Sequence, residues 1–318
     1  MLTVQKFGGS SVADAERIRR AADIIAEARA SGSDVVAVLS AAGDTTDELT
    51  ERAAAINEIP SPRELDALLS TGELQSVALM SMQLQRLGVD AVSLSGRQAG
   101  IITDASHGCA VIKDIKTDRI LRELSHGRAV IVAGFQGISP HDDITTLGRG
   151  GSDTSAVALA AALKADRCEI YSDVDGVYTA DPRLVTDAKK LGEIDYADML
   201  RLALGGSQVL HSRAVETAMA NNTQVLMLSS FVKKRGTLMH RLAGRPSLCG
   251  VTRDRHLGKI SLVGKDAGIS ALSELVSLLT DCEIQVISAE LAEGVCSVTV
   301  SPASQLPALQ IVHRHFFG

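Results

Sequence analysis

The sequence predicts an α/β protein whose largely parallel sheet is covered by helices on both faces. Strand-length apolar runs alternate with helical patterns from residue 2 to residue 229. The runs at 34–40 (DVVAVLS) and 128–134 (RAVIVAG) are almost continuously apolar, which is typical of strands buried on both faces. Polar, glycine-rich segments follow several of these strands. Ligands collect at the carboxyl ends of strands in such sheets, so a binding site is expected there.

The elements follow from local patterns. Residues 2–7 form a strand that ends at two glycines, and apolar residues from Ile18 to Ala28 recur at helical spacing within 13–30. By the same criteria, further strands are expected at 34–40, 90–95, 128–134, 168–172 and 224–229. Further helices are expected at 44–56, 62–86, 152–165, 195–204 and 208–221.

A boundary is expected near 240–256, where glycines and Pro246 occur in a polar stretch. We therefore predict a large domain at 1–245 and a small α+β module at 257–318. Strands are expected in the module at 259–263, 283–288 and 295–300, and helices at 268–280 and 304–315. A unit this small is expected to pack on the main domain or on a second copy.

Composition narrows the class of protein. The chain is 45% hydrophobic and 22% charged with a net charge of −6, which argues against a general nucleic-acid or membrane-surface binder. No apolar run approaches the roughly 18 residues of a membrane span. The N-terminus does not resemble a signal peptide, and five cysteines without a CxxC pair suggest buried thiols. A cytoplasmic location is expected.

The first candidate segment is Lys6-Phe7-Gly8-Gly9-Ser10-Ser11. Two glycines let the backbone turn sharply after a strand, and the amides that follow would point outward at a helix start, where anions bind. Lys6 can place a positive charge on the same anion. The alternative is a tight strand–helix turn capped by Ser, and no Walker loop occurs in the chain.

The second candidate segment is 145–155 (TTLGRGGSDTS). Arg149 offers a bidentate fork for a carboxylate or phosphate, and Asp153 follows in the first helical turn. Asp153 could be a helix cap, but a cap does not require three glycines and an Arg before it. Function is therefore the favoured interpretation.

The third candidate segment, 171–183 (YSDVDGVYTADPR), leaves a strand and carries three aspartates, a Gly and a Pro-Arg. EF-hand calcium spacing is absent. A nucleotide-contacting loop fits better, with a surface loop as the alternative. Residues 40–47 and 70–73 supply hydroxyls and Glu73 as substrate-side candidates, although each alone also fits a helix cap.

Together these segments resemble the aspartate kinases of the amino-acid kinase family. The matching stretches, in the order and spacing of the family, are KFGGSSV (6–12), SAAGDTTDEL (40–49), LLSTGE (68–73), SLSGRQAGI (93–101), VAGFQG (132–137), TTLGRGGSDTSAVALAAAL (145–163) and EIYSDVDGVYTADPR (169–183). The resemblance implies a three-layer α/β/α fold with an ACT-like C-terminal module. It also implies transfer of phosphate from ATP to the side-chain carboxylate of L-aspartate.

The resemblance further implies a role for individual residues. Lys6 and Asp153 would be catalytic, and the substrate would be bound by Thr45, Glu73, Arg149 and Ser152. ATP would be bound by Lys6, Gly8, Gly9, Ser10, Ser40, Ser172, Asp173, Tyr178, Arg183 and Gln208. MgATP would be a co-substrate that carries its own magnesium, with no protein-held metal and no tightly bound cofactor. The expected partners are ATP, L-aspartate and a second copy of the chain in a homodimer or higher oligomer, without nucleic acid or membrane.

The sequence departs from the family in three places. Gln208 stands where the family usually has a lysine near the nucleotide, and 226–231 (LMLSSF) lacks two usual arginines. Only one ACT-like module, with a sheet that may lack a closing strand, fits at 257–318. In the family, inhibitory lysine or threonine usually binds between modules of two chains, so little or no feedback inhibition is expected. Two alternatives stay open: a weak or inactive regulatory paralogue, and a kinase for another small amino acid.

Overall fold

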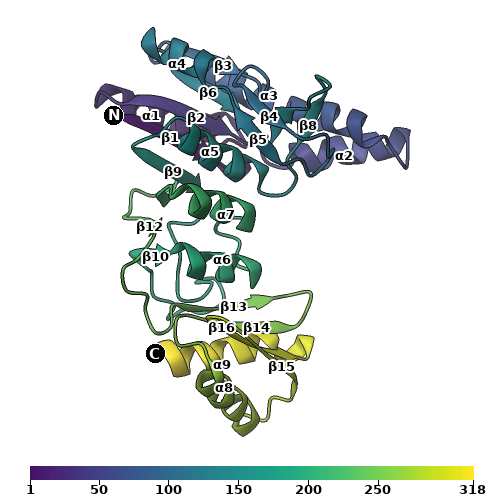
Figure 1. The fold of residues 1–318 in the computed structure, drawn as a ribbon, viewed down its shortest axis with the longest axis vertical. Coiled ribbons are helices and arrows are strands. Elements are labelled where there is room, and N and C mark those ends of the chain that lie inside the picture. The colour runs from purple at the N-terminus through teal and green to yellow at the C-terminus, as the bar shows by residue number, and fades with distance from the viewer. The chain divides into compact units, whose positions relative to one another are not determined.

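The computed structural model describes residues 1–318, which form two compact units (Figure 1). The first unit contains Met1–Asp175 and Thr223–Arg235, and the second contains Gly176–Asn222 and Gly236–Gly318. None of the helices combines the length and apolar character that a membrane crossing requires.

Parallel strands form the centre of the first unit, in the order β11-β9-β1-β2-β6-β3. Their bounds are β1 Leu2–Phe7, β2 Asp34–Leu39, β3 Ala91–Leu94, β6 Ala129–Ala133, β9 Arg167–Ser172 and β11 Val225–Ser229. β1 lies between β2 and β9, with Lys6 opposite Val38 and Ile170. The end of β1 is therefore at the centre of the edge where a parallel sheet binds ligands.

Helices cover both faces of this sheet, which confirms the predicted fold class. The helices of the first unit are α1 Ala15–Ala30, α2 Thr45–Ile56, α3 Pro62–Arg86, α4 Asp118–Ser125 and α5 Gly151–Ala162. α1 and α3 share one buried apolar cluster with alternate residues of the strands, including Phe7, Leu39 and Ile131. α5 packs on β1, β2 and β9, and α4 packs on β6.

A small second sheet in the first unit leads the chain into the segment that contains Arg149. Its order is β5-β4-β7-β8. The bounds are β4 Ile101–Thr103, β5 Ile112–Ile115, β7 Gln136–Ile138 and β8 Ile144–Thr146. These strands have three or four residues each, which explains why the apolar pattern of the sequence did not predict them.

The second unit holds the remaining elements. The elements before its C-terminal module are β10 Glu193–Asp195, α6 Tyr196–Leu204, α7 Ser212–Asn221 and β12 Thr237–His240. Its C-terminal module contains β13 Gly250–Asp254, β14 Lys259–Val263, α8 Ile269–Asp281, β15 Val286–Ala292, β16 Val295–Val300 and α9 Gln305–Phe317. The module strands pair antiparallel in the order β13-β14-β16-β15. α8 and α9 pack on this sheet around one apolar cluster (Figure 1).

Several details differ from the sequence predictions. β13 lies inside 240–256, where a boundary was expected, and it provides an edge strand for a sheet that was expected to lack one. β15 begins at Val286 rather than at residue 283, and Glu283, just after α8, has a positive φ of 58°. α7 begins at Ser212, after the cap His211, so Gln208 precedes the helix. Cys109 and Cys282 are exposed, contrary to the expectation of buried thiols.

Candidate active site

The glycine turn after β1 is shaped by close contact with the chain that follows β2. A Cβ atom at Gly9 would lie 2.8 Å from the carbonyl oxygen of Ala41, closer than a side chain tolerates. The Gly9 carbonyl accepts a hydrogen bond from the Gly43 amide at 3.1 Å, and the Gly8 amide donates to the Tyr171 carbonyl at 3.2 Å. The turn is therefore fixed between the ends of β2 and β9, in the position expected for an anion cradle.

Lys6 forms an ion pair at the end of β1. Its Nζ atom lies 2.6 Å from a carboxylate oxygen of Asp153, which stands in the first turn of α5. Lys6 is only 8% exposed, so the pair is largely removed from water and its attraction is stronger than that of a surface pair. The two predicted catalytic residues are thus brought together.

The segment that carries Arg149 needs its glycines for conformation and for space. Gly148 and Gly150 have φ values of 75° and 68°, which L-residues with side chains rarely adopt. A Cβ atom at Gly151 would lie 2.9 Å from the side chains of Leu147 and Phe135. The glycines let α5 begin directly against the end of β6, and the exposed Arg149 side chain has no ion-pair partner of its own.

Glu73 is a buried carboxylate on α3, and only one of its two oxygens has a hydrogen-bond partner. Its side chain is 3% exposed, one oxygen accepts a hydrogen bond from the Ala41 amide at 3.0 Å, and the other oxygen, Oε2, has no partner. Burial raises the pKa of Glu73 to about 7. A buried acceptor without a donor is costly, and a cationic group would supply the missing partner.

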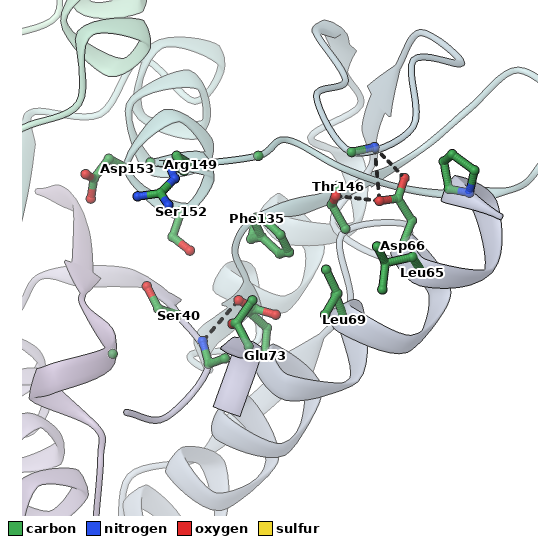
Figure 2. A pocket seen from close by; sticks show the side chains of 18 of the residues that line it. Ser40, Leu65, Asp66, Leu69, Glu73, Phe135, Thr146, Arg149, Ser152 and Asp153 are labelled. Carbon is green, nitrogen blue, oxygen red and sulfur yellow. Dashed lines mark hydrogen bonds between the residues drawn. The ribbon is translucent and has the colours of Figure 1, made fainter. Parts of the chain in front are cut away.

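These groups line a single cavity of about 740 Å³ in the first unit. Figure 2 shows Arg149, Ser152 and Asp153 on one side, and Ser40 and Glu73 on another. The predicted site residues that line it are Lys6, Gly9, Ser40, Glu73, Arg149, Ser152 and Asp153. Gly8, Ser10 and Thr45 are adjacent in sequence to the lining residues Gly9 and Thr46. The Thr45 hydroxyl donates to the Ala42 carbonyl at 2.6 Å.

The cavity also contains Asp66, which the sequence analysis missed. Asp66 is 1% exposed, and its carboxylate accepts from the Thr146 hydroxyl at 2.5 Å and from the Gly108 amide at 3.0 Å (Figure 2). His107 lies 2.8 Å from the same carboxylate. Asp66 thus ties α3 to β8, three residues before Arg149. A signal was present, because Asp66 and Glu73 are two helical turns apart and therefore share a face.

The remaining predicted nucleotide residues are divided between the two units. Ser172 and Asp173 belong to the first unit, whereas Tyr178, Arg183 and Gln208 belong to the second. Arg183 donates two hydrogen bonds to Asp181, at 3.0 and 2.9 Å, and this pairing lowers the pKa of Asp181. Asp173 and Gln208 are exposed.

Comparison with known proteins gives a consistent result. The model of the amino acid kinase family matches residues 1–229. The aspartokinase of Corynebacterium glutamicum is 48% identical over 294 residues, which is 90% of this chain and 69% of the relative. Aspartokinase 2 of Bacillus subtilis is 47% identical over 288 residues, covering 90% of this chain and 71% of the relative.

Solved structures agree on the fold. The aspartate kinase from Synechocystis superposes with a TM-score of 0.69 at 40% identity, covering 98% of this chain and 54% of that one. E. coli aspartokinase III in complex with aspartate and ADP superposes with a TM-score of 0.87, covering 100% of both chains. Its identity is 22%, so this second match supports the fold alone.

Proposed function

Because the chain belongs to the amino acid kinase family and is an aspartate kinase of that family, we propose that it phosphorylates the side-chain carboxylate of L-aspartate with MgATP to give 4-phospho-L-aspartate. The observation that carries this proposal is the pairing of opposite charges in one cavity, with Arg149 on one side and Glu73 on another. An α-amino acid presents a carboxylate and an ammonium group close together, and this arrangement matches both.

We assign the acceptor contacts by charge. Arg149 would bind the α-carboxylate through its planar fork. The ammonium group would donate to Glu73 Oε2, the buried oxygen that lacks a partner. Thr45 and Ser152 would supply hydroxyls to the rest of the substrate. Binding of the ammonium group would favour ionised Glu73 and lower its pKa from about 7.

The chemical step requires charge stabilisation rather than a base, because the attacking side-chain carboxylate of aspartate is already ionised. Lys6 would neutralise negative charge on the phosphoryl group during transfer, and Asp153 would hold the Lys6 ammonium in place through their 2.6 Å contact. The amides at Gly9 and Ser10 would cradle the phosphates, and Gly8, whose amide already donates to the Tyr171 carbonyl, would let the backbone approach them closely. The rate then depends on positioning and electrostatics.

The nucleotide contacts complete the proposal. Ser40, Ser172 and Asp173 would contact ATP. The resemblance to the aspartate kinases implies the same role for Tyr178, Arg183 and Gln208. Magnesium would arrive with ATP as part of the substrate.

We also propose that the chain forms a homodimer through its C-terminal module. β15 is an edge strand of the module sheet, and its outer edge is unpaired. Ile287 and Leu291 on this strand are 63% and 48% exposed. Exposed apolar edge strands tend to pair with another chain. Light scattering that finds only monomer at micromolar concentration would contradict the dimer.

The 318-residue chain by itself is proposed to respond little to lysine or threonine, because residues 257–318 supply one module. The test is an activity titration with each amino acid and with both together. A steep fall in rate would overturn this part of the proposal while leaving the reaction intact.

A coupled assay tests the reaction itself. Release of ADP would be followed with aspartate present, and the acyl phosphate would be trapped with hydroxylamine. We expect hydroxamate in proportion to ADP with L-aspartate and none with succinate, which has no ammonium group for Glu73. If no hydroxamate forms although the protein binds MgADP, the proposed reaction is wrong.

A further inference from the structure

The segments of the second unit that carry Tyr178, Arg183 and Gln208 (the nucleotide-side segments) contact the C-terminal module. Ala180 and Val185, which flank Arg183, are buried in the same apolar cluster as module residues such as Leu275 and Leu309. The segment that carries Tyr178 therefore shares the module core. The predicted division at residues 245–257 would place these parts in separate domains.

Thr179, next to Tyr178, has every polar atom engaged. Its carbonyl accepts from the Val251 amide of β13 at 2.7 Å, and its amide donates to the Lys189 carbonyl at 2.9 Å. Its hydroxyl oxygen accepts from the Lys189 amide at 2.9 Å and is hydrogen-bonded to His313 Nε2 at 2.8 Å. His313 is 1% exposed on α9, where burial lowers its pKa and keeps the imidazole neutral at pH 7.

The loop that carries Gln208 is bonded to Thr252 of β13, the residue after Val251. The Thr252 hydroxyl donates to the Gly205 carbonyl at 3.3 Å. A Cβ atom at Gly206, whose φ is 108°, would lie 2.3 Å from the Arg253 carbonyl. α6, which leads into this loop, is fixed in turn, because Arg201 Nε donates to the Glu293 carbonyl at 2.6 Å.

We propose that the C-terminal module positions the nucleotide-side residues, and that His313 is a positioning residue for Tyr178 through its hydrogen bond to Thr179. The inference rests on the proposed function, because it takes Tyr178 and Gln208 as nucleotide contacts. β13 then acts as a shared support, with Val251 holding one segment and Thr252 the other. A change in the module would reach ATP binding through these bonds without any contact between the module and the nucleotide.

The chain offers a matched control for this proposal. His315 lies two residues further along α9, and its Nε2 atom is 2.7 Å from Glu274 on α8. It is thus a histidine hydrogen-bonded within the module, without a bond to the nucleotide-side segment. His313→Leu and His315→Leu change the same residue type on the same helix.

The experiment measures KM for MgATP, KM for aspartate and kcat in the full chain. We expect His313→Leu and Thr179→Val each to raise KM for MgATP roughly five- to tenfold, with little change in KM for aspartate. The double variant should be no worse than either single one, since both remove one hydrogen bond. His313→Gln keeps a hydrogen-bonding group, so its KM for MgATP should lie close to the wild-type value. His315→Leu should leave KM for MgATP unchanged.

Calorimetry with MgADP distinguishes failure of this inference from failure of the proposed reaction. Wild-type protein that binds MgADP without forming hydroxamate contradicts the reaction alone. Equal MgADP affinity in wild type and His313→Leu overturns the positioning role. Equal weakening in His313→Leu and His315→Leu also overturns it, because that result would reflect a general loss of module stability.

Discussion

Polar groups are satisfied in opposite ways in two parts of the molecule. One part is the cavity of the first unit that contains Glu73 and Arg149 (the acceptor cavity), and the other is the nucleotide-side segments of the second unit. In the cavity, Glu73 Oε2 has no partner and Arg149 has no counter-ion. In the second unit, Thr179 is bonded at every polar atom and Arg183 is paired with Asp181. The cavity therefore keeps unsatisfied charge that a substrate can complete, whereas the nucleotide side is held in shape before any ligand binds.

This contrast separates two kinds of substitution. Changes in the cavity should remove charge that the substrate or the transition state uses, so they should act strongly on kcat or on KM for aspartate. Changes in the second unit should alter positioning and act on KM for MgATP. An Arg149 or Glu73 variant with an effect only on KM for MgATP would contradict the comparison.

The largest effect is expected for Lys6→Ala. If Lys6 neutralises the migrating phosphoryl group as proposed, removal of this buried cation should lower kcat by about 10³-fold. Initial rates of hydroxamate formation at saturating substrates measure this. Lys233→Ala is the control, since Lys233 forms an exposed ion pair with Glu27 at 2.8 Å. A fall in kcat of less than tenfold would show that Lys6 does not stabilise the transition state.

Glu73→Gln should weaken aspartate binding and at the same time stabilise the folded protein. KM for aspartate should rise about 100-fold, because the proposed buried partner of the ammonium group loses its charge. The free energy of unfolding at pH 8 should increase by about 1–2 kcal/mol, since an unfavourable buried charge disappears. Equilibrium denaturation with urea provides the second measurement.

The control for stability is Glu123→Gln. Glu123 is also buried, but its carboxylate is paired with Arg128 at 2.8 Å and with Arg119 at 2.7 Å, which lowers its pKa. This variant should destabilise the protein and leave KM for aspartate unchanged. If Glu73→Gln and Glu123→Gln lower the free energy of unfolding equally, the buried charge of Glu73 is not unfavourable.

The pH dependence of aspartate binding should report Glu73 directly. Its pKa in the free protein is raised to about 7, so the carboxylate is protonated below that pH. KM for aspartate should therefore rise by about tenfold for each pH unit below 7. Low pH, which weakens aspartate binding, should stabilise the fold through the same residue. The stabilisation from protonated Glu73 is fully present below its ordinary pKa of 4.5 and is lost as pH rises through about 7. A flat KM profile from pH 5.5 to 8 would contradict the assignment.

Asp66→Ala tests whether positioning also matters inside the cavity. The variant leaves the Thr146 hydroxyl and the Gly108 amide without their acceptor, so the free energy of unfolding should fall by about 1–3 kcal/mol. kcat/KM for aspartate should fall about tenfold, because the segment before Arg149 loses its tie to α3. Asp66→Asn keeps an acceptor oxygen and should show a smaller loss. Unchanged kcat/KM in folded Asp66→Ala would limit Asp66 to a structural role.

The sequence predicted the fold well where patterns were long. The strands β2 and β6 are almost continuously apolar, and the helical pattern of α3 extends over 25 residues. The strands β4, β7 and β8 have three residues each, too few for a period to emerge. β13 was missed because its polar residues Thr252, Arg253 and Asp254 resemble a linker, although backbone pairing with β14 fixes it as a strand.

The candidate site was predictable to the extent that its residues lie in glycine-rich segments at strand ends. Lys6 and Arg149 stand beside glycines that mark close approaches of the backbone. Asp66 and His313 have no such neighbours, because their roles arise from contacts 80 and 134 residues away in the sequence. Such pairings depend on tertiary structure. The one local signal for Asp66 is its spacing of two helical turns from Glu73, and His313 has no local signal.

The smallest effect is expected for Gln208→Lys, on the nucleotide side. Gln208 is exposed in the loop before α7, so an added lysine would be screened by water. We expect KM for MgATP to fall about two- to fivefold, with kcat changed less than twofold, and the gain should shrink as salt is raised. Ser207→Lys is the matched control, since it adds the same charge one residue away. Hydroxamate formation by Gln208→Lys but not by wild type would instead show that Gln208 has inactivated the site. In that case the unsatisfied charges of the acceptor cavity would serve binding without turnover.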